Sequence, residues 1–120
     1  MRHALCLLLA AASLGACSFH ARGPDEYRMA VREVLDARQP DVHACYERAY
    51  TADERMKGRV VAKFQVAAKS GQLMSPQIVD EETTAPEPLK QCVLASLDGV
   101  TIAPPDQRTG DAKFVWDFGP

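Results

Sequence analysis

The chain has 120 residues, of which 47% are hydrophobic, and 14 lysines and arginines face 16 aspartates and glutamates. This length accommodates one small globular domain with short appendages. The net charge of −2 gives no basic excess with which to neutralise phosphates, so we do not expect a nucleic-acid binder.

The N-terminal segment has the three parts of a secretory signal. A short positive start, Met1-Arg2-His3, precedes an uncharged and largely apolar run from Ala4 to Leu14. The small residues Gly15-Ala16 follow, and then Cys17. The apolar run is shorter than the roughly 20 residues that a membrane-spanning helix needs. Residues 1–16 are therefore predicted to be a signal peptide.

The end of this signal, Leu14-Gly15-Ala16-Cys17, resembles the lipobox of bacterial lipoproteins. The resemblance implies cleavage before Cys17, diacylglycerol on its thiol and a fatty acid such as palmitate on its amine. Two or more acyl chains give a stable membrane anchor. Ser18 stands where an aspartate would resemble an inner-membrane retention signal, so the resemblance implies the periplasmic face of the outer membrane. In the alternative, an ordinary secreted protein, Cys17 would leave an odd number of cysteines.

After the predicted lipid site and a short tether, residues 17–24, one domain is expected over residues 25–120. A helix is predicted from Asp25 to about Arg38, because four apolar residues share one helical face: Tyr27, Val31, Val34 and Leu35. Pro40 interrupts this helix and suits the first turn of a second one, which extends to about Tyr50. The apolar stripe of the second helix contains Val42, Cys45, Tyr46 and Ala49.

A β-hairpin is predicted next. Residues 58–66 alternate between apolar and polar side chains, and Val61 is the exception, for which a surface position is the commoner interpretation. Gly71 suits the turn, and the second strand extends from Leu73 to about Asp80. Pro76 cannot donate a ladder hydrogen bond, which predicts that the second strand lies at a sheet edge.

A third helix and a last strand complete the chain. Thr84 and Glu87 have the spacing of a capping box at a helix start. The apolar face of this helix contains Leu89, Cys92, Val93 and Leu97. The final strand, 111–118, is predicted to direct Phe114, Trp116 and Phe118 into the core.

These elements predict an α+β domain in the order α-β-β-α-β. Its small three-stranded antiparallel sheet carries the helices on one face. The first strand is expected in the centre, with the second and the last strand at the two edges.

Cys45 and Cys92 remain as a pair once Cys6 leaves with the signal and Cys17 is acylated. We predict a structural disulfide between them. A redox role is disfavoured because the chain has no Cys-x-x-Cys motif. A zinc site that also used His43 would lack the four ligands of a structural site. We therefore expect no metal, no cofactor and no catalytic residue.

Several of these residues together resemble a known family. Cys45-Tyr46-Glu47 is followed by Gly58-Arg59-Val60-Val61-Ala62-Lys63-Phe64, by Gly71 and Cys92, and by Pro104-Pro105 before the aromatic strand. Over about Val31 to Phe118 this pattern resembles the AgmX/PglI C-terminal domain family, which is similar to the C-terminal domain of TonB. The resemblance implies a TonB-C-terminal-like fold and a periplasmic interaction module without catalytic activity.

The expected partners are the envelope membrane, through the lipid anchor, and another cell-envelope protein, with no small-molecule substrate. An edge strand can accept an extended peptide by β-augmentation, which makes Lys113, Val115 and Asp117 of the last strand the candidate partner-binding residues. In the alternative interpretation this strand only packs the core, and its two charges protect the edge. An alternative function is a structural envelope factor that binds peptidoglycan or stabilises the outer membrane.

Overall fold

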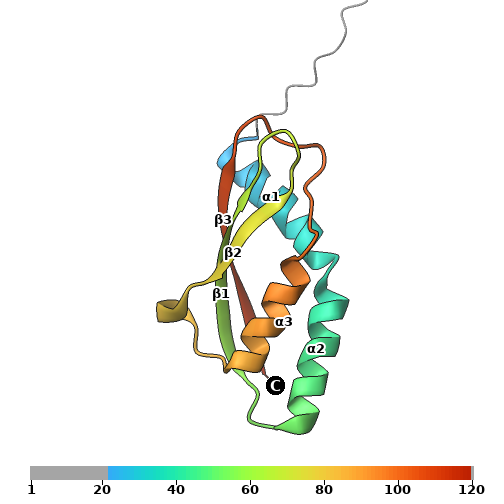
Figure 1. The fold of residues 1–120 in the computed structure, drawn as a ribbon, viewed down its shortest axis with the longest axis vertical. Helices are drawn as coiled ribbons and strands as arrows, with labels where there is room; N and C mark the ends of the chain where they lie inside the picture. The colour runs from blue at the N-terminus through green and yellow to red at the C-terminus, as the bar shows by residue number, and fades with distance from the viewer. Residues whose placement is uncertain (1–21, 120) are drawn as a thin grey trace, which may run out of the picture.

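The computed structural model describes residues 22–119, so the predicted signal peptide and lipid site at Cys17 lie outside the described residues. Two consecutive helices open the fold, α1 (Pro24–Asp36) and α2 (Gln39–Ala52). The hairpin of β1 (Gly58–Val66) and β2 (Leu73–Ile78) follows, then a short 3-10 turn η1 (Asp80–Glu82). The helix α3 (Glu87–Leu97) and the strand β3 (Gly110–Phe118) complete it (Figure 1).

The three strands form one antiparallel sheet in the order β2-β1-β3, which confirms the predicted α+β class and the central place of the first strand. β1 and β3 pair over their full lengths, with Val60 opposite Trp116 and Phe64 opposite Ala112. β2 is shorter than predicted and lies at an edge, as Pro76 required. Ser75 has a left-handed backbone conformation, and the register to β1 shifts between Lys63 and Gln65.

The core lies between one face of the sheet and the helices. Alternate residues of β1 point into it, and α1 and α3 contribute buried residues of the predicted apolar faces: Val31, Leu35, Leu89, Val93 and Leu97. Of the three aromatic residues of β3, Trp116 is buried whereas Phe114 and Phe118 are half-buried. The predicted aromatic strand therefore does contribute to the core, chiefly through its tryptophan.

Val61 is buried, and its commoner interpretation as a surface valine is wrong. It belongs to the face of the sheet that points away from the helices, yet only 2% of it is exposed. The chain between β2 and α3 runs beside it: its carbonyl accepts a hydrogen bond from the Val79 amide, and its amide donates to Thr83 Oγ1. Alternation correctly assigns the face of a strand residue, but it does not reveal a non-strand segment that covers that face.

Thr84 does not form the predicted capping box. α3 begins three residues later, at Glu87, after Pro86, and no side chain caps it. Thr84 Oγ1 instead accepts a hydrogen bond of 2.9 Å from the amide of Arg59, and the Thr84 amide donates back to the Arg59 carbonyl. The threonine therefore attaches the connection to β1 and not to the helix.

Candidate functional site

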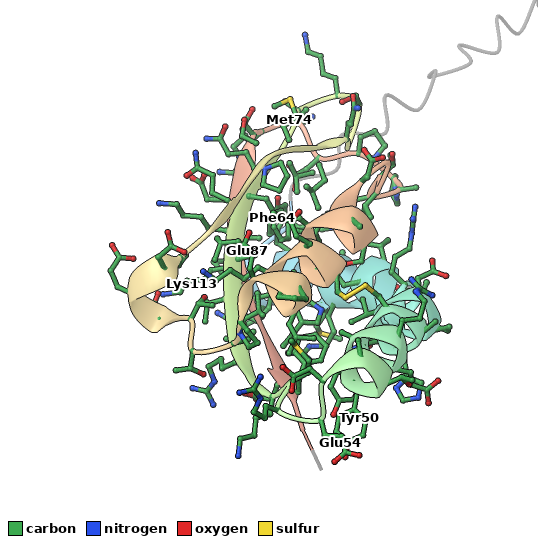
Figure 2. The ribbon with its side chains drawn as sticks, turned by 60° about the horizontal axis from the view of Figure 1, so that its bottom comes forward. Tyr50, Glu54, Phe64, Met74, Glu87 and Lys113 are labelled. Atoms are coloured by element: carbon green, nitrogen blue, oxygen red, sulfur yellow. A yellow bond between two sulfur atoms is a disulfide. The ribbon has the colours of Figure 1, made fainter. Side chains whose placement is uncertain are left out.

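The predicted disulfide is present and joins two helices. Cys45 on α2 and Cys92 on α3 are bonded, with their α-carbons 5.6 Å apart (Figure 2). Cys92 is buried and Cys45 is half-buried, so the bond lies at the contact between the helices. His43, which we considered as a third metal ligand, is exposed and pairs with Glu47 at 3.0 Å. Within residues 22–119 no group of three or more metal-ligating side chains comes together.

The three predicted partner-binding residues all point away from the core, but two of them already make hydrogen bonds within the domain. Lys113 donates a 2.7 Å hydrogen bond to Glu82 on η1. Asp117 accepts a 2.9 Å hydrogen bond from Arg59 on the neighbouring strand. Val115 lies between them and is 49% exposed, which makes it the apolar side chain on this face that a partner could contact.

β3 presents a free edge along its nine residues. Among residues 22–119, its backbone makes hydrogen bonds only to β1, so the groups that point away from β1 have no backbone partner. The side chains of the strand do not replace such a partner, because their hydrogen bonds among the described residues are to η1 and β1. An unpaired edge of this length is a template for another strand.

The opposite edge of the sheet is occupied or irregular. Beyond the end of β2, the connection at residues 79–85 makes backbone hydrogen bonds to the edge of β1. At the other end of β2, the Leu73 amide donates to the Val100 carbonyl and Gln72 bridges to Thr101. The left-handed Ser75 and Pro76 interrupt the middle of the strand. β3 therefore offers the longer regular edge for a further strand.

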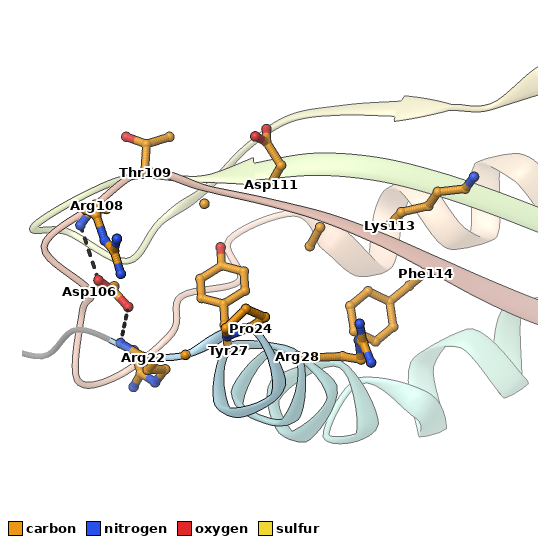
Figure 3. Close-up of a pocket in the computed structure, with 13 residues that line it drawn as sticks. Arg22, Pro24, Tyr27, Arg28, Asp106, Arg108, Thr109, Asp111, Lys113 and Phe114 are labelled. Carbon is orange, nitrogen blue, oxygen red and sulfur yellow. Dashed lines mark hydrogen bonds between the residues drawn. The ribbon is translucent and has the colours of Figure 1, made fainter.

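A pocket of about 580 Å³ lies beside the start of β3, between this strand, the first turns of α1 and the loop at residues 106–109 (Figure 3). Tyr27 points from α1 toward the strand, and its ring packs directly against Gly110. Burial, with the charges of Asp106 and Asp111, raises the pKa of Tyr27 to about 12. The hydroxyl is buried and has no hydrogen-bond partner among the described residues. This tyrosine sets the separation of α1 and β3.

Asp106 fixes the start of the domain to the loop before β3. It is buried, and its carboxylate accepts hydrogen bonds from the amide of Arg22 at 2.9 Å and from the amide of Arg108 at 3.2 Å. These bonds, the one from Arg22 foremost, lower the pKa of Asp106. Arg22 is also buried, and its Nη2 donates to the Pro104 carbonyl at 2.7 Å. Arg22 thus belongs to the domain, although we expected it in the tether.

Two arginines of α1 lie along the same strand. The Arg32 guanidinium stands over the Phe114 ring, 5.7 Å from its centroid. Arg28, one turn earlier, lines the pocket and extends toward Phe114 (Figure 3). Among the described residues, its one ion pair is with Asp25, at 3.8 Å, and both side chains are largely exposed. Arg32 makes no ion pair within residues 22–119.

The sequence indicated β3 as the candidate edge, but it did not indicate the side chains that flank this strand. A signal was present, because Arg28 and Arg32 are four residues apart and therefore lie on one side of the predicted helix. The pattern could not indicate which element that side faces. None of the helices in the described part of the chain has the length and apolar character needed to cross a membrane.

Comparisons with protein-family models, curated proteins and solved structures found no match to this chain.

Proposed function

We propose that this protein is a non-catalytic lipoprotein of the bacterial outer membrane. Its domain binds an extended segment of another cell-envelope protein, which adds to the sheet as a fourth strand beside β3. The free nine-residue edge of β3 carries this proposal, because the opposite edge is occupied or irregular. The lipobox at Leu14–Cys17 supports the anchor and the compartment.

The disulfide supports the same compartment. A bond between Cys45 and Cys92 forms and persists in an oxidising space such as the periplasm. The resemblance to the AgmX/PglI C-terminal domain family, and through it to TonB, belongs to the same proposal and agrees with an interaction module.

Site-specific crosslinking tests the binding edge. A photo-crosslinking amino acid at Val115 on β3 should capture a protein partner in native membranes, because this side chain is exposed beside the free edge. The matched control is Met74 on β2, which is 38% exposed at the other edge. Capture from both positions alike, or from neither, would contradict docking on β3.

Hydrogen exchange then tests the mode of binding. Once the captured protein is identified and added, amides of β3 that point away from β1 should exchange more slowly, since they gain a backbone partner. Amides of β2 should be unchanged. Protection confined to the helices would show that the partner binds elsewhere. Sedimentation with purified cell-wall sacculi, combined with no capture at Val115, would favour the peptidoglycan alternative.

A further inference from the structure

We infer that the segment docked on β3 is acidic: it carries aspartate or glutamate at alternate positions, and Arg28 and Arg32 bind these carboxylates. This inference rests on the proposed docking of a strand on β3 and specifies the chemistry of that strand. Its basis is the charge of the surface that borders the free edge on the helix side of the sheet.

The direction of the side chains follows from the sheet. Successive residues of an added strand point to opposite faces, so every second residue points to the side where α1 lies. There it meets Phe114 and the two arginines that flank this ring. The remaining residues point to the other face, where they meet Val115 and three charged side chains of β3, which are Asp111, Lys113 and Asp117.

Two of the three charges of β3 on that other face are already paired with an opposite charge. Lys113 binds Glu82, and Asp117 binds Arg59. On the helix side, Asp106 is occupied by the amides of Arg22 and Arg108. Of the two arginines of α1 beside the edge, Arg28 makes one ion pair, with Asp25 at 3.8 Å, in which both side chains are largely exposed. Arg32 makes no ion pair among the described residues. On the helix side of the sheet, the exposed charges that border the free edge are therefore those of Arg28 and Arg32, which favour an anionic partner there. Asp111, whose carboxylate has no cationic partner among residues 22–119, lies on the other face of the strand.

The spacing of the two arginines fits a strand. Residues four apart on a helix are separated by about 6 Å along its axis. Alternate residues of a strand are separated by about 6.7 Å. α1 and β3 run in the same direction here, since Tyr27 meets Gly110 and Arg32 meets Phe114. Two carboxylates at positions i and i+2 of the docked strand can therefore each face one guanidinium, which binds a carboxylate with two parallel hydrogen bonds.

A peptide that alternates aspartate with threonine, about eight residues long, is the direct probe. The full chain should bind it, and the peptide with asparagine in place of aspartate should bind about tenfold more weakly, because it lacks the charge. The double variant Arg28→Gln/Arg32→Gln should lose affinity for the aspartate peptide by a similar factor. Affinity should also fall with added salt, which screens exposed charges. Equal binding of both peptides, or none, would overturn the inference.

The matched control is Arg48→Gln, which removes the same charge from an exposed position of α2. It should bind the aspartate peptide like the unmodified chain. All variants should stay folded, because the three arginines are exposed. The double variant should lose no more than a few degrees in its thermal midpoint, since Arg32 gives up only its contact with the Phe114 ring. If Arg48→Gln lost as much affinity for the aspartate peptide as the double variant, the loss would come from the change in net charge. The arginines of α1 would then have no specific role.

Crosslinking separates this inference from the proposed function. Suppose that the double variant with the crosslinker at Val115 still captures the partner at full yield. The edge would then bind a strand, but the two arginines would not contribute to its recognition. If Val115 captures nothing in the unmodified protein, docking on β3 itself is wrong, and this inference falls with it.

Two other occupants of the arginine surface give distinct results. Suppose that the chain carrying Cys17→Ser binds anionic phospholipid vesicles but not the peptide, and that the two arginine substitutions abolish the binding to vesicles. The arginines would then bind lipid head groups. A concentration-dependent dimer that the double variant abolishes, again without peptide binding, would assign the surface to a second copy. Either result overturns an acidic partner strand.

Discussion

The ring of Tyr27 lies directly against Gly110, so that a β-carbon at position 110 would overlap the outer end of the ring. This contact joins the first turn of α1 to the first residue of β3, which are far apart in the sequence. It determines how closely the helix approaches the strand, and therefore where Arg28 lies relative to the free edge.

Gly110→Ala should destabilise the domain by about 1–3 kcal/mol, because the added methyl group must displace the ring or the strand. The midpoint of urea unfolding measures this loss. Gly23→Ala is the control for steric overlap, since a β-carbon there meets nothing within 4 Å, and it should lose less stability than Gly110→Ala because only the N-cap preference of α1 is affected. Adding Tyr27→Ala to Gly110→Ala should cost less than the sum of the two single changes. Strict additivity would show that the two residues do not interact.

Tyr27→Phe should leave stability at neutral pH unchanged or slightly increased, because the hydroxyl that it removes is buried without a hydrogen-bond partner among residues 22–119. The raised pKa of about 12 predicts a difference in alkali. A tyrosine whose pKa rises on folding stabilises the folded state below its unfolded pKa of about 10, and this contribution is lost as the pH rises toward 12.

Urea unfolding of both proteins across this alkaline range measures the difference. The unmodified protein should lose stability relative to Tyr27→Phe as the pH rises above about 10. A constant difference between the two proteins would mean that the Tyr27 hydroxyl titrates as freely in the folded state as in the unfolded state.

Asp106→Asn should destabilise the domain at neutral pH. The neutral side chain of asparagine accepts hydrogen bonds from the backbone N–H groups of Arg22 and Arg108 less strongly than the carboxylate does. The lowered pKa of Asp106 sets the sign of the pH effect. The stabilisation is present above the unfolded pKa of about 3.9 and is lost as the pH falls through the lower folded value. Unfolding midpoints should therefore converge in acid. If the unfolding midpoints of the two proteins differed equally at about pH 3 and about pH 7, the Asp106 carboxylate would not be the source of the stabilisation.

Cys45→Ala/Cys92→Ala should lower the free energy of unfolding by up to about 4 kcal/mol, since the bond closes a loop between residues separated by 47 positions. Reducing the unmodified protein should produce a similar loss. The reductant should have no effect on the double variant, which is the control. If reductant destabilised both proteins alike, the effect would not arise from this disulfide.

Cys17→Ser should release the protein from the membrane fraction, because it removes the predicted site of acylation. Cys6→Ser is the control and should remain with the membrane, since Cys6 is predicted to leave with the signal peptide. Fractionation followed by immunoblotting measures both variants. Retention of Cys17→Ser in the membrane fraction would remove the lipoprotein proposal.

Local chemistry was sufficient to predict the order of elements. Period-two alternation marked β1, the helical stripe placed Cys45 on a face that contacts another helix, and Pro76 placed β2 at an edge. Each of these signals depends on near neighbours in the chain or on a restraint within one residue. The cysteine count likewise predicted which two thiols would pair.

Tertiary structure decided the rest, because contacts between distant segments leave no periodic signal. Val61 is covered by a connection, Thr84 binds β1, and Asp106 holds Arg22 from 84 positions away. The charged border of the free edge has the same origin. The sequence by itself determined that α1 carries two arginines one turn apart, and only the packing of Tyr27 on Gly110 brought them beside β3.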